Sequence, residues 1–273
     1  MKYMTFNSSC SYAGVANMLE QYGVNTDDRS IALRMKLPYL FSFERGVYMS
    51  GPMLQSADWF NLYLNPIGFE MTETEMPSAH VPEFLKRQKT AMIGMQVSEN
   101  DKHAVVYTGS QDGKLVFLNN KWEQDSAPNQ FWFTDTEIVN HLESLTMVAT
   151  LKQIDSKEVD LRSRLAESIS VIQQNLYEIK SLCARQETVA RLRSMLNTLF
   201  RPLFLDGITM LNLLGKVELA NQFSHIQKGF LNAIRQDPNA IVFLGDNFAV
   251  SDLVDAVGEY TQLIAEQIIL LRE

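Results

Sequence analysis

Cys10 is the residue whose type and position best suit chemistry. It follows Asn7-Ser8-Ser9 and directly precedes a segment with helical periodicity. The unpaired N–H groups and the positive dipole at a helix start stabilise a thiolate, so we expect a lowered thiol pKa and a nucleophilic sulfur. The backbone N–H of Cys10 would also face an oxyanion that forms on an attacked carbonyl.

A cysteine nucleophile needs a base, and the chain offers His80, His103, His141 and His225. His80 lies in a predicted loop, His141 near the end of a short predicted helix, and His225 beside the apolar stripe of a C-terminal helix. His103 opens a predicted strand. Because a strand end holds an imidazole in place and leaves it reachable, we interpret His103 as the general base.

An orienting acceptor for the imidazole is expected on the next strand. The dipeptide Asp112-Gly113 is a strong signal for a tight hairpin turn. Such a turn brings the start of the strand with His103 next to the end of the following strand. Asn119 ends that strand, and we expect it beside His103. Asn120 would take this place if the register were shifted by one residue.

Each of these residues also has a structural interpretation. Cys10 suits a small buried apolar position, and His103 suits a strand edge where it bonds to a carbonyl. Asn119 and its neighbour suit an ordinary turn. Cys183 falls on an apolar helical stripe and is interpreted as structural. No His and Cys pair has metal-ligand spacing, so the sequence predicts neither a metal nor a cofactor.

The first half of the chain must position these side chains with short helices and short strands. Helical spacing and turn residues predict a first helix that begins at about Cys10 and ends before Gly23, and further helices over residues 26–35, 53–64, 81–86 and 135–141. The second helix would be capped by Asn25, and the last has a capping box of Thr134 and Glu137. Strands are predicted over residues 91–97, 104–108, 115–118, 131–133 and 145–151. An aromatic loop over residues 38–52 suits either a substrate groove or packing.

From about residue 156 the chain has the periodicity of long amphipathic helices. Apolar residues recur every three or four positions in stripes over residues 161–183, 189–203, 219–234 and 253–271. Pro202 is expected to bend or end the second helix. The predicted fold class is therefore α+β, with a mixed domain over residues 1–154 and an all-α bundle over residues 155–273.

Composition limits the classes of function. The chain has 273 residues, 46% of them hydrophobic, and a net charge of −8. This acidic balance argues against general nucleic-acid binding, which needs clustered basic residues. The two cysteines do not make a disulfide framework, and no signal-peptide pattern or membrane-length apolar run is present. We therefore expect a cytoplasmic protein that binds neither nucleic acid nor membrane.

One segment departs from the acidic balance. Between residues 180 and 201 there are five basic residues and a single acid. Arg185, Arg191 and Arg193 are candidates for docking an acidic partner such as an acyl carrier protein. The alternative is that they form an ordinary solvated helix face.

The order of these features resembles the papain-like superfamily. The residues that carry the resemblance are Cys10 at a helix start, Tyr22-Gly23 at its end, the aromatic segment 40–46 with Gly46, His103 opening a strand and Asn119 closing the next. Within that superfamily the chain is similar to the domains typified by double-glycine leader peptidases, and more closely to the N-terminal domain of the butirosin-biosynthesis acyltransferase family. The resemblance covers roughly the first half of the chain. It implies that Cys10 is the nucleophile, His103 the general base and acid, and Asn119 the orienting residue.

One position departs from the papain-like peptidases. Those enzymes usually have an oxyanion-binding glutamine six residues before the cysteine, and this chain has Met4 there. Asn7, Ser8 and Gln55 are candidates for the missing donor. Such a donor typically contributes about a hundredfold to a thousandfold in rate. Either one of these residues supplies it, or the substrate is an activated ester or thioester that needs less help.

Three functions are compatible with this sequence. The first is an acyltransferase that moves an acyl group from a carrier-protein thioester through Cys10 to an amine, in small-molecule biosynthesis. The residue at position 4, the helical second half and the acyltransferase resemblance favour it. The second is a stand-alone cysteine peptidase or amidase that acts on a peptide. The third is an inactive binding module on a papain-like fold, with partner contacts made by the helical half.

Overall fold

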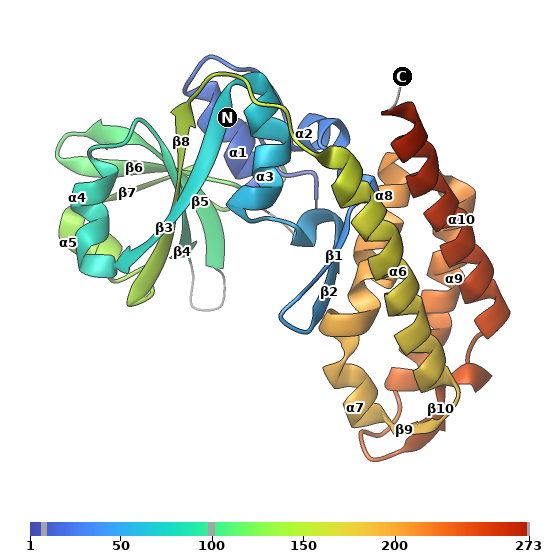
Figure 1. Ribbon diagram of the computed structural model, residues 1–273. Coiled ribbons are helices and arrows are strands. Elements are labelled where there is room, and N and C mark those ends of the chain that lie inside the picture. Colours follow the sequence, from blue (N-terminus) through green and yellow to red (C-terminus); the bar gives the residue numbers. More distant parts are fainter. Residues whose placement is uncertain (7–9, 98–101, 272–273) are drawn as a thin grey trace. The chain divides into compact units, whose positions relative to one another are not determined.

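The computed structural model describes residues 1–6, 10–97 and 102–271, and its chain forms two compact units (Figure 1). The first unit comprises residues 1–35 and 55–159, and the second comprises residues 36–54 and 160–273. The first unit contains a large sheet, and the second is mainly helical. The predicted α+β class with a helical C-terminal part is confirmed.

An antiparallel sheet is the centre of the first unit. Its strand order in the described residues is β3-β8-β4-β5-β6-β7. The strands are β3 (Phe69–Pro77), β4 (Ala91–Gln96), β5 (Lys102–Gln111), β6 (Lys114–Asn119), β7 (Gln130–Phe133) and β8 (Leu145–Gln153). All of these except β3 were predicted. β3 is an edge strand whose exposed Thr-Glu-Thr-Glu stretch lacks the apolar alternation that marks a strand.

The hairpin of β5 and β6 turns at Asp112-Gly113, as predicted. Both residues have positive φ, 51° and 76°, as a two-residue hairpin turn of type I′ requires. The ladder places Val105 opposite Asn119, after a shift of register near Gly109. The end of β6 therefore lies beside the start of β5, where the base was expected.

The helices of the first unit lie around this sheet. They are α1 (Ser11–Glu20), α2 (Asp28–Arg34), α3 (Ala57–Leu64), α4 (Val81–Leu85) and α5 (Asp135–Val139). The capping box of Thr134 and Glu137 is present at the start of α5. The predicted cap at Asn25 is wrong, because Asp27 accepts the hydrogen bond from the backbone N–H of Ser30 at 2.7 Å.

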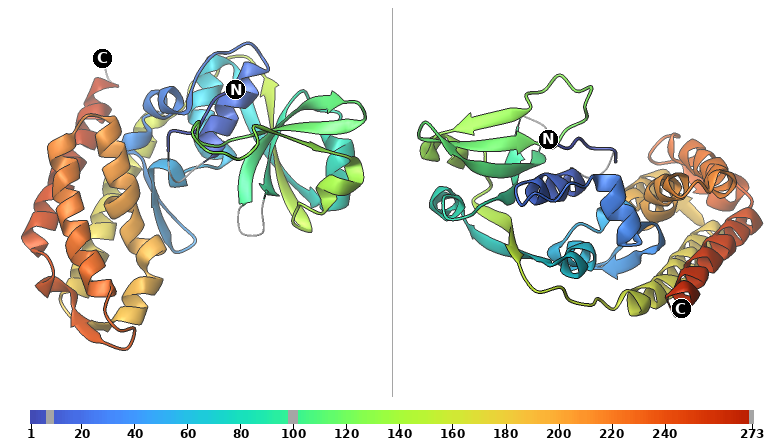
Figure 2. Two further views of the ribbon diagram at one scale, coloured as in Figure 1. Left: turned by 180° about the vertical axis from the view of Figure 1, so that it is seen from behind. Right: turned by 90° about the horizontal axis from the view of Figure 1, so that it is seen from above.

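The two faces of the sheet pack against different helices (Figures 1 and 2). On one face, Ile93, Val105 and Phe117 form a core with apolar residues of α4 and α5. Met92 points to the other face because successive side chains of a strand alternate. There it lies directly against Gly14 of α1. The opening helix is thus held close to the central strands.

The second unit is built mainly from helices. They are α6 (Leu161–Cys183), α7 (Val189–Ser194), α8 (Ile208–Leu213), α9 (Val217–Ile234) and α10 (Val250–Leu270). The chain around Pro202 forms two π-helical stretches, Leu196–Phe200 and Pro202–Gly207. The three-residue strands β9 (Gln186–Thr188) and β10 (Ile241–Phe243) pair antiparallel. They were not predicted, because strands this short show no periodicity.

Residues 36–54 form a hairpin instead of the predicted loop. β1 (Phe41–Glu44) and β2 (Val47–Ser50) pair antiparallel. The turn residues Arg45 and Gly46 have positive φ, 52° and 82°. Arginine is uncommon at positive φ, so Arg-Gly gives a weaker turn signal than Asn-Gly or Asp-Gly. The strands were missed for that reason.

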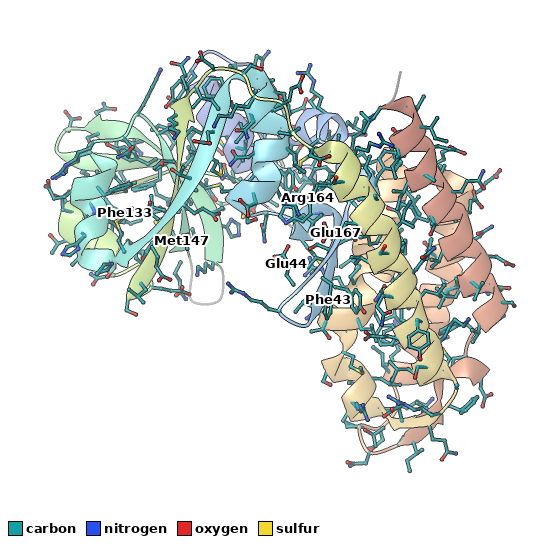
Figure 3. All side chains as sticks on the ribbon, in the orientation of Figure 1. Phe43, Glu44, Phe133, Met147, Arg164 and Glu167 are labelled. Carbon is teal, nitrogen blue, oxygen red and sulfur yellow. The ribbon has the colours of Figure 1, made fainter. Side chains whose placement is uncertain are left out.

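This hairpin belongs to the second unit. The backbone N–H of Phe41 donates to Ser168 Oγ of α6 at 2.9 Å, and the Tyr48 hydroxyl donates to Glu178 of α6 at 2.6 Å. Phe43 on β1 is half exposed (Figure 3). The compact units therefore divide the chain differently from the predicted boundary at residue 154, which places this segment in the first domain.

Helix length and polarity also bear on membrane insertion. In the described ranges, every helix is too short or too polar to cross a bilayer.

Candidate active site

Cys10 is the N-cap residue of α1 and directly precedes its first residue, Ser11. The Cys10 carbonyl accepts a hydrogen bond from the backbone N–H of Gly14 at 3.0 Å, which closes the first turn. The side chain is partly buried. The cysteine is therefore at the helix start that the sequence predicted.

The start of β5 lies against the Cys10 sulfur. The backbone N–H of Ala104 donates to Cys10 Sγ at 3.1 Å. His103 is the preceding residue of the strand, so the fold brings nucleophile and candidate base to one place. Among the described residues, no hydrogen bond joins the sulfur to the His103 ring. Contacts of this kind are often long before substrate binds and shorten in the substrate complex.

Asn119 faces the imidazole, as predicted. His103 Nδ1 and Asn119 Oδ1 are 3.3 Å apart. Asn119 Nδ2 donates to the carbonyl of Pro128 at 3.0 Å, which leaves the amide oxygen toward the ring. An amide oxygen only accepts, so Nδ1 carries the proton and Nε2 carries the lone pair. The ring is thus held in the tautomer that a base acting through Nε2 requires.

The register decides between the two asparagines at the end of β6. Asn119 contacts His103, whereas Asn120 does not take that position. Asn120 Nδ2 donates to the carbonyl of Ala104 at 2.8 Å, and its Oδ1 accepts from Asn17 Nδ2 at 2.9 Å. Both Asn17 and Asn120 are fully buried.

The pKa of the Cys10 thiol does not follow the sequence-based expectation. Burial raises this pKa above its ordinary value. The backbone N–H groups of Ala104 and of Cys10 itself lower it, but by less. The predicted lowering is therefore wrong, because the sulfur at the helix start is packed against the sheet. At neutral pH Cys10 rests as a thiol and must lose its proton to a base as it attacks.

The other histidines have different surroundings. His80 ends a short 3-10 turn before α4. His141 Nδ1 lies 2.9 Å from the Gln96 carbonyl, and its ring packs on Phe133 at a centroid distance of 4.6 Å. His225 is exposed on α9, in the second unit. Of the described histidines in the first unit, His103 is the one whose chain neighbour, Ala104, contacts the Cys10 sulfur.

Gln55 is positioned next to the nucleophile. The hydroxyl of Ser11, the residue after Cys10, donates to Gln55 Oε1 at 3.0 Å. The Gln55 amide is therefore held beside the first turn of α1, where an oxyanion donor is needed.

The other oxyanion candidates gain no support. Asn7 and Ser8 lie outside the described residues. Met4 is buried, and its backbone N–H donates to the Lys121 carbonyl at 2.9 Å. A thioether has no proton to donate, so Met4 does not replace the glutamine that papain-like peptidases usually have.

The three candidate docking arginines make local contacts. Arg185 Nε lies 2.7 Å and Arg191 Nη1 lies 3.2 Å from the buried carboxylate of Glu187. Arg193 donates to two backbone carbonyls at the C-terminal end of α9, both at 2.7 Å. These contacts give the basic segment a structural role. Docking of an acidic partner stays a prediction.

Sequence reasoning missed three contributors to this site. Ala104 acts through its backbone N–H, which no side-chain pattern reveals. Asn17 lies inside a helix and meets Asn120 across 103 residues of chain. Asn120 was considered only as a substitute for Asn119. Within the ranges that the structure describes, no group of His, Cys, Asp or Glu side chains has the arrangement of a metal site.

The order of Cys, His and Asn along this unit is the one that the papain-like resemblance implies. Neither protein-family models nor curated proteins match the chain. Among solved structures, the chain is similar to the crystal structure of the peptidase domain of Streptococcus ComA, a bi-functional ABC transporter involved in a quorum-sensing pathway. The two are 13% identical with a TM-score of 0.38, over 54% of this chain and 95% of that chain.

Proposed function

We propose that this protein is a cysteine-dependent acyl-transfer enzyme that works through a thioester on Cys10. The observation that carries the proposal is the contact of Cys10 Sγ with the backbone of Ala104 at 3.1 Å, next to an imidazole oriented by Asn119. A nucleophile, a base with its lone pair on Nε2 and an orienting amide thus meet within one compact unit.

The first step would form the acyl-enzyme. Cys10 rests as a thiol, so its proton passes to His103 Nε2 as Sγ attacks the carbonyl of the acyl donor. The tetrahedral oxyanion is stabilised by the backbone N–H of Cys10 and the amide of Gln55. The leaving group departs and takes the proton from the imidazolium. For a thioester donor, the products are a free carrier thiol and acyl-Cys10.

The second step would pass the acyl group to an acceptor. An amine attacks the carbonyl of acyl-Cys10, and His103 Nε2 accepts the amine proton. Expulsion of Sγ, which takes that proton back, gives an amide and regenerates the Cys10 thiol. Water in place of the amine would make the same site a hydrolase.

One observation favours an activated donor such as a carrier-protein thioester over a peptide. Burial raises the thiol pKa, so Cys10 is not held ready as a thiolate. A thioester carbonyl is more electrophilic than an amide and needs less assistance. We therefore propose a carrier-bound acyl donor and a small-molecule amine as acceptor.

The test compares two substrate classes on the same protein. Acyl-pantetheine thioesters of varied chain length are offered with a primary amine, and a peptide panel is offered separately. Cys10→Ser should abolish turnover. Cys183→Ser, which replaces the buried cysteine of α6, should retain it.

The outcomes separate the candidate functions. Amide formation from the thioesters supports the proposal. Peptide cleavage without amide formation would make the protein a peptidase. If the folded protein turned over neither class, the binding module would be the better interpretation.

A further inference from the structure

The backbone of Ala104 is bound by side chains at the point where the β5–β6 ladder ends. The last paired residues are Val105 and Asn119. One position further, the Ala104 N–H donates to Cys10 Sγ at 3.1 Å, and the Ala104 carbonyl accepts from Asn120 Nδ2 at 2.8 Å. In a continued antiparallel ladder, both groups of such a residue would bond to the neighbouring strand. Here they bond to the nucleophile and to a buried amide instead.

The side chain of Asn120 is itself held by Asn17. Its Oδ1 accepts from Asn17 Nδ2 at 2.9 Å. Asn17 lies on α1, about two turns after Cys10. The Asn17 side chain is in turn fixed by the backbone of Lys2, whose N–H donates to Oδ1 at 2.6 Å and whose carbonyl accepts from Nδ2 at 3.0 Å.

The backbone groups at the two ends of this chain of bonds fix the orientation of both amides. The Lys2 N–H can only donate, so the oxygen of Asn17 faces it and the Asn17 NH₂ faces Asn120. The Ala104 carbonyl can only accept, so the NH₂ of Asn120 faces it. Every bond then joins a donor to an acceptor. Each nitrogen and oxygen atom of the two amides has a partner and both side chains are fully buried, which makes the network rigid.

Gly14 leaves the space that Asn120 occupies. A Cβ atom at Gly14 would lie 2.7 Å from Asn120 Nδ2, closer than packed atoms approach. Any larger residue there would displace the amide or push α1 away from the sheet. The position of Asn120 is thus determined both by its hydrogen bonds and by the helix that carries Cys10.

From this arrangement we infer that Asn120, held by Asn17, is a positioning residue for Cys10: by binding the Ala104 carbonyl it fixes the backbone of Ala104, so that the Ala104 N–H remains on the sulfur. The inference rests on the proposed function of Cys10 as nucleophile. A hydrogen bond donated to sulfur stabilises the thiolate more than the thiol. The Ala104 N–H belongs to the peptide bond with His103, so Asn120 and Asn17 also hold the start of β5, which carries the base.

The test measures the pH dependence of Cys10 alkylation by iodoacetamide in the Cys183→Ser background. The variants are Asn120→Ala and Asn17→Ala. Asn175→Ala is the matched control, because Asn175 is also fully buried and also donates to a backbone carbonyl, that of Leu199 in the second unit. Native folding of each variant is checked by near-ultraviolet circular dichroism.

We expect Asn120→Ala to move the midpoint of the alkylation profile upward by about one pH unit, a tenfold loss of thiolate at a fixed pH below the midpoint. Asn17→Ala should move it in the same direction by less, and Asn175→Ala should leave it in place. If Asn120→Ala does not fold, Asn17→Ala decides the question. An unchanged midpoint in the folded variants would overturn the inference.

This readout uses no substrate, so it separates the inference from the proposed function. If the variants shift the alkylation profile but the protein transfers no acyl group, the positioning role of Asn120 is supported and the proposed acyl-transfer activity is rejected. If the protein transfers acyl groups but the profile is unshifted, the activity is supported and the positioning role is rejected.

Discussion

The imidazole of His103 and the side-chain amide of Asn119 face each other at 3.3 Å, from Nδ1 to Oδ1. They come from two strands of one hairpin, and Asn119 is fully buried. Its NH₂ group donates to Pro128, so only its oxygen is turned toward the ring. This relationship fixes the ring tautomer.

Removing the amide oxygen should release the ring. Asn119→Ala is expected to lower the acyl-transfer rate by about 100-fold, the lower range of what a positioned general base contributes. Asn119→Asp keeps an acceptor opposite Nδ1 and should lose less. In a steady-state assay, the loss should fall on kcat more than on KM. Equal rates for the Ala variant and the parent protein would show that Asn119 does not act through His103.

The pH profile of the parent protein tests the state of the thiol. Burial is the largest influence on Cys10 and raises its pKa, so the folded value lies above that of the unfolded chain. The alkylation midpoint should therefore be higher than in urea. The shift stabilises the folded protein below the unfolded pKa, and this contribution is lost as pH rises through the folded pKa. A midpoint at or below the urea value would contradict the burial seen here.

Cys183 provides an internal comparison for that experiment. Burial raises the pKa of Cys183 to about 12. It should react with iodoacetamide more slowly than Cys10 at every pH at which the protein stays folded. Peptide mapping distinguishes the two, because trypsin places them in fragments 3–29 and 181–185.

Gln55 should act on the oxyanion and not on the thiol. Gln55→Ala is expected to lower kcat by about a hundredfold to a thousandfold, the usual effect of removing one oxyanion donor. Gln55→Glu keeps an acceptor for the Ser11 hydroxyl but removes the donor, so it should be equally impaired. Ser11→Ala is the milder control. If the Ala and Glu variants keep full activity, the second oxyanion donor lies elsewhere.

Arg193 is expected to contribute to stability in the second unit. Its guanidinium donates to the carbonyls of Ile234 and Gln236 at the end of α9. Arg193→Ala should lower the free energy of unfolding by about 1 kcal/mol, because hydrogen bonds from a charged group are lost at a partly exposed site. Arg193→Lys keeps the charge but cannot bind both carbonyls in the same geometry. Its free energy of unfolding, measured by urea denaturation, should therefore lie between those of the parent protein and Arg193→Ala.

Arg193→Ala and Arg193→Lys also distinguish a role of Arg193 in stability from a role in docking an acidic partner. A carrier protein that recognises charge alone should bind the Lys variant as tightly as the parent protein at low salt. Equal stability of all three proteins would show that the carbonyl contacts are unimportant.

The parts of the site that depend on local pattern were predictable. The Asp112-Gly113 turn brings the end of β6 beside the start of β5, and the helical periodicity after Cys10 places it at a helix start. The choice between Asn119 and Asn120 needed the register, because one residue of slip exchanges their roles.

The parts that depend on distant packing were not predictable. The Cys10 thiol was expected to be acidic from its helix position, but burial against β5 outweighs that effect. The contact of Asn17 with Asn120 joins segments 103 residues apart. The periodicity of apolar residues, which predicts helices and strands, carries no information about a contact between such distant segments. The hairpin at residues 41–50 was also missed, because Arg45 rather than Asn or Asp takes the left-handed turn position.

The central claim is that Cys10 carries the acyl group, and the mass of the protein after brief exposure to an acyl-pantetheine thioester without acceptor tests it most directly. We expect a mass increase of one acyl group, located in tryptic fragment 3–29. It should be absent in Cys10→Ser and slow to form in His103→Ala. An acyl group that persists in Cys10→Ser, or that is found on Cys183, would contradict the claim.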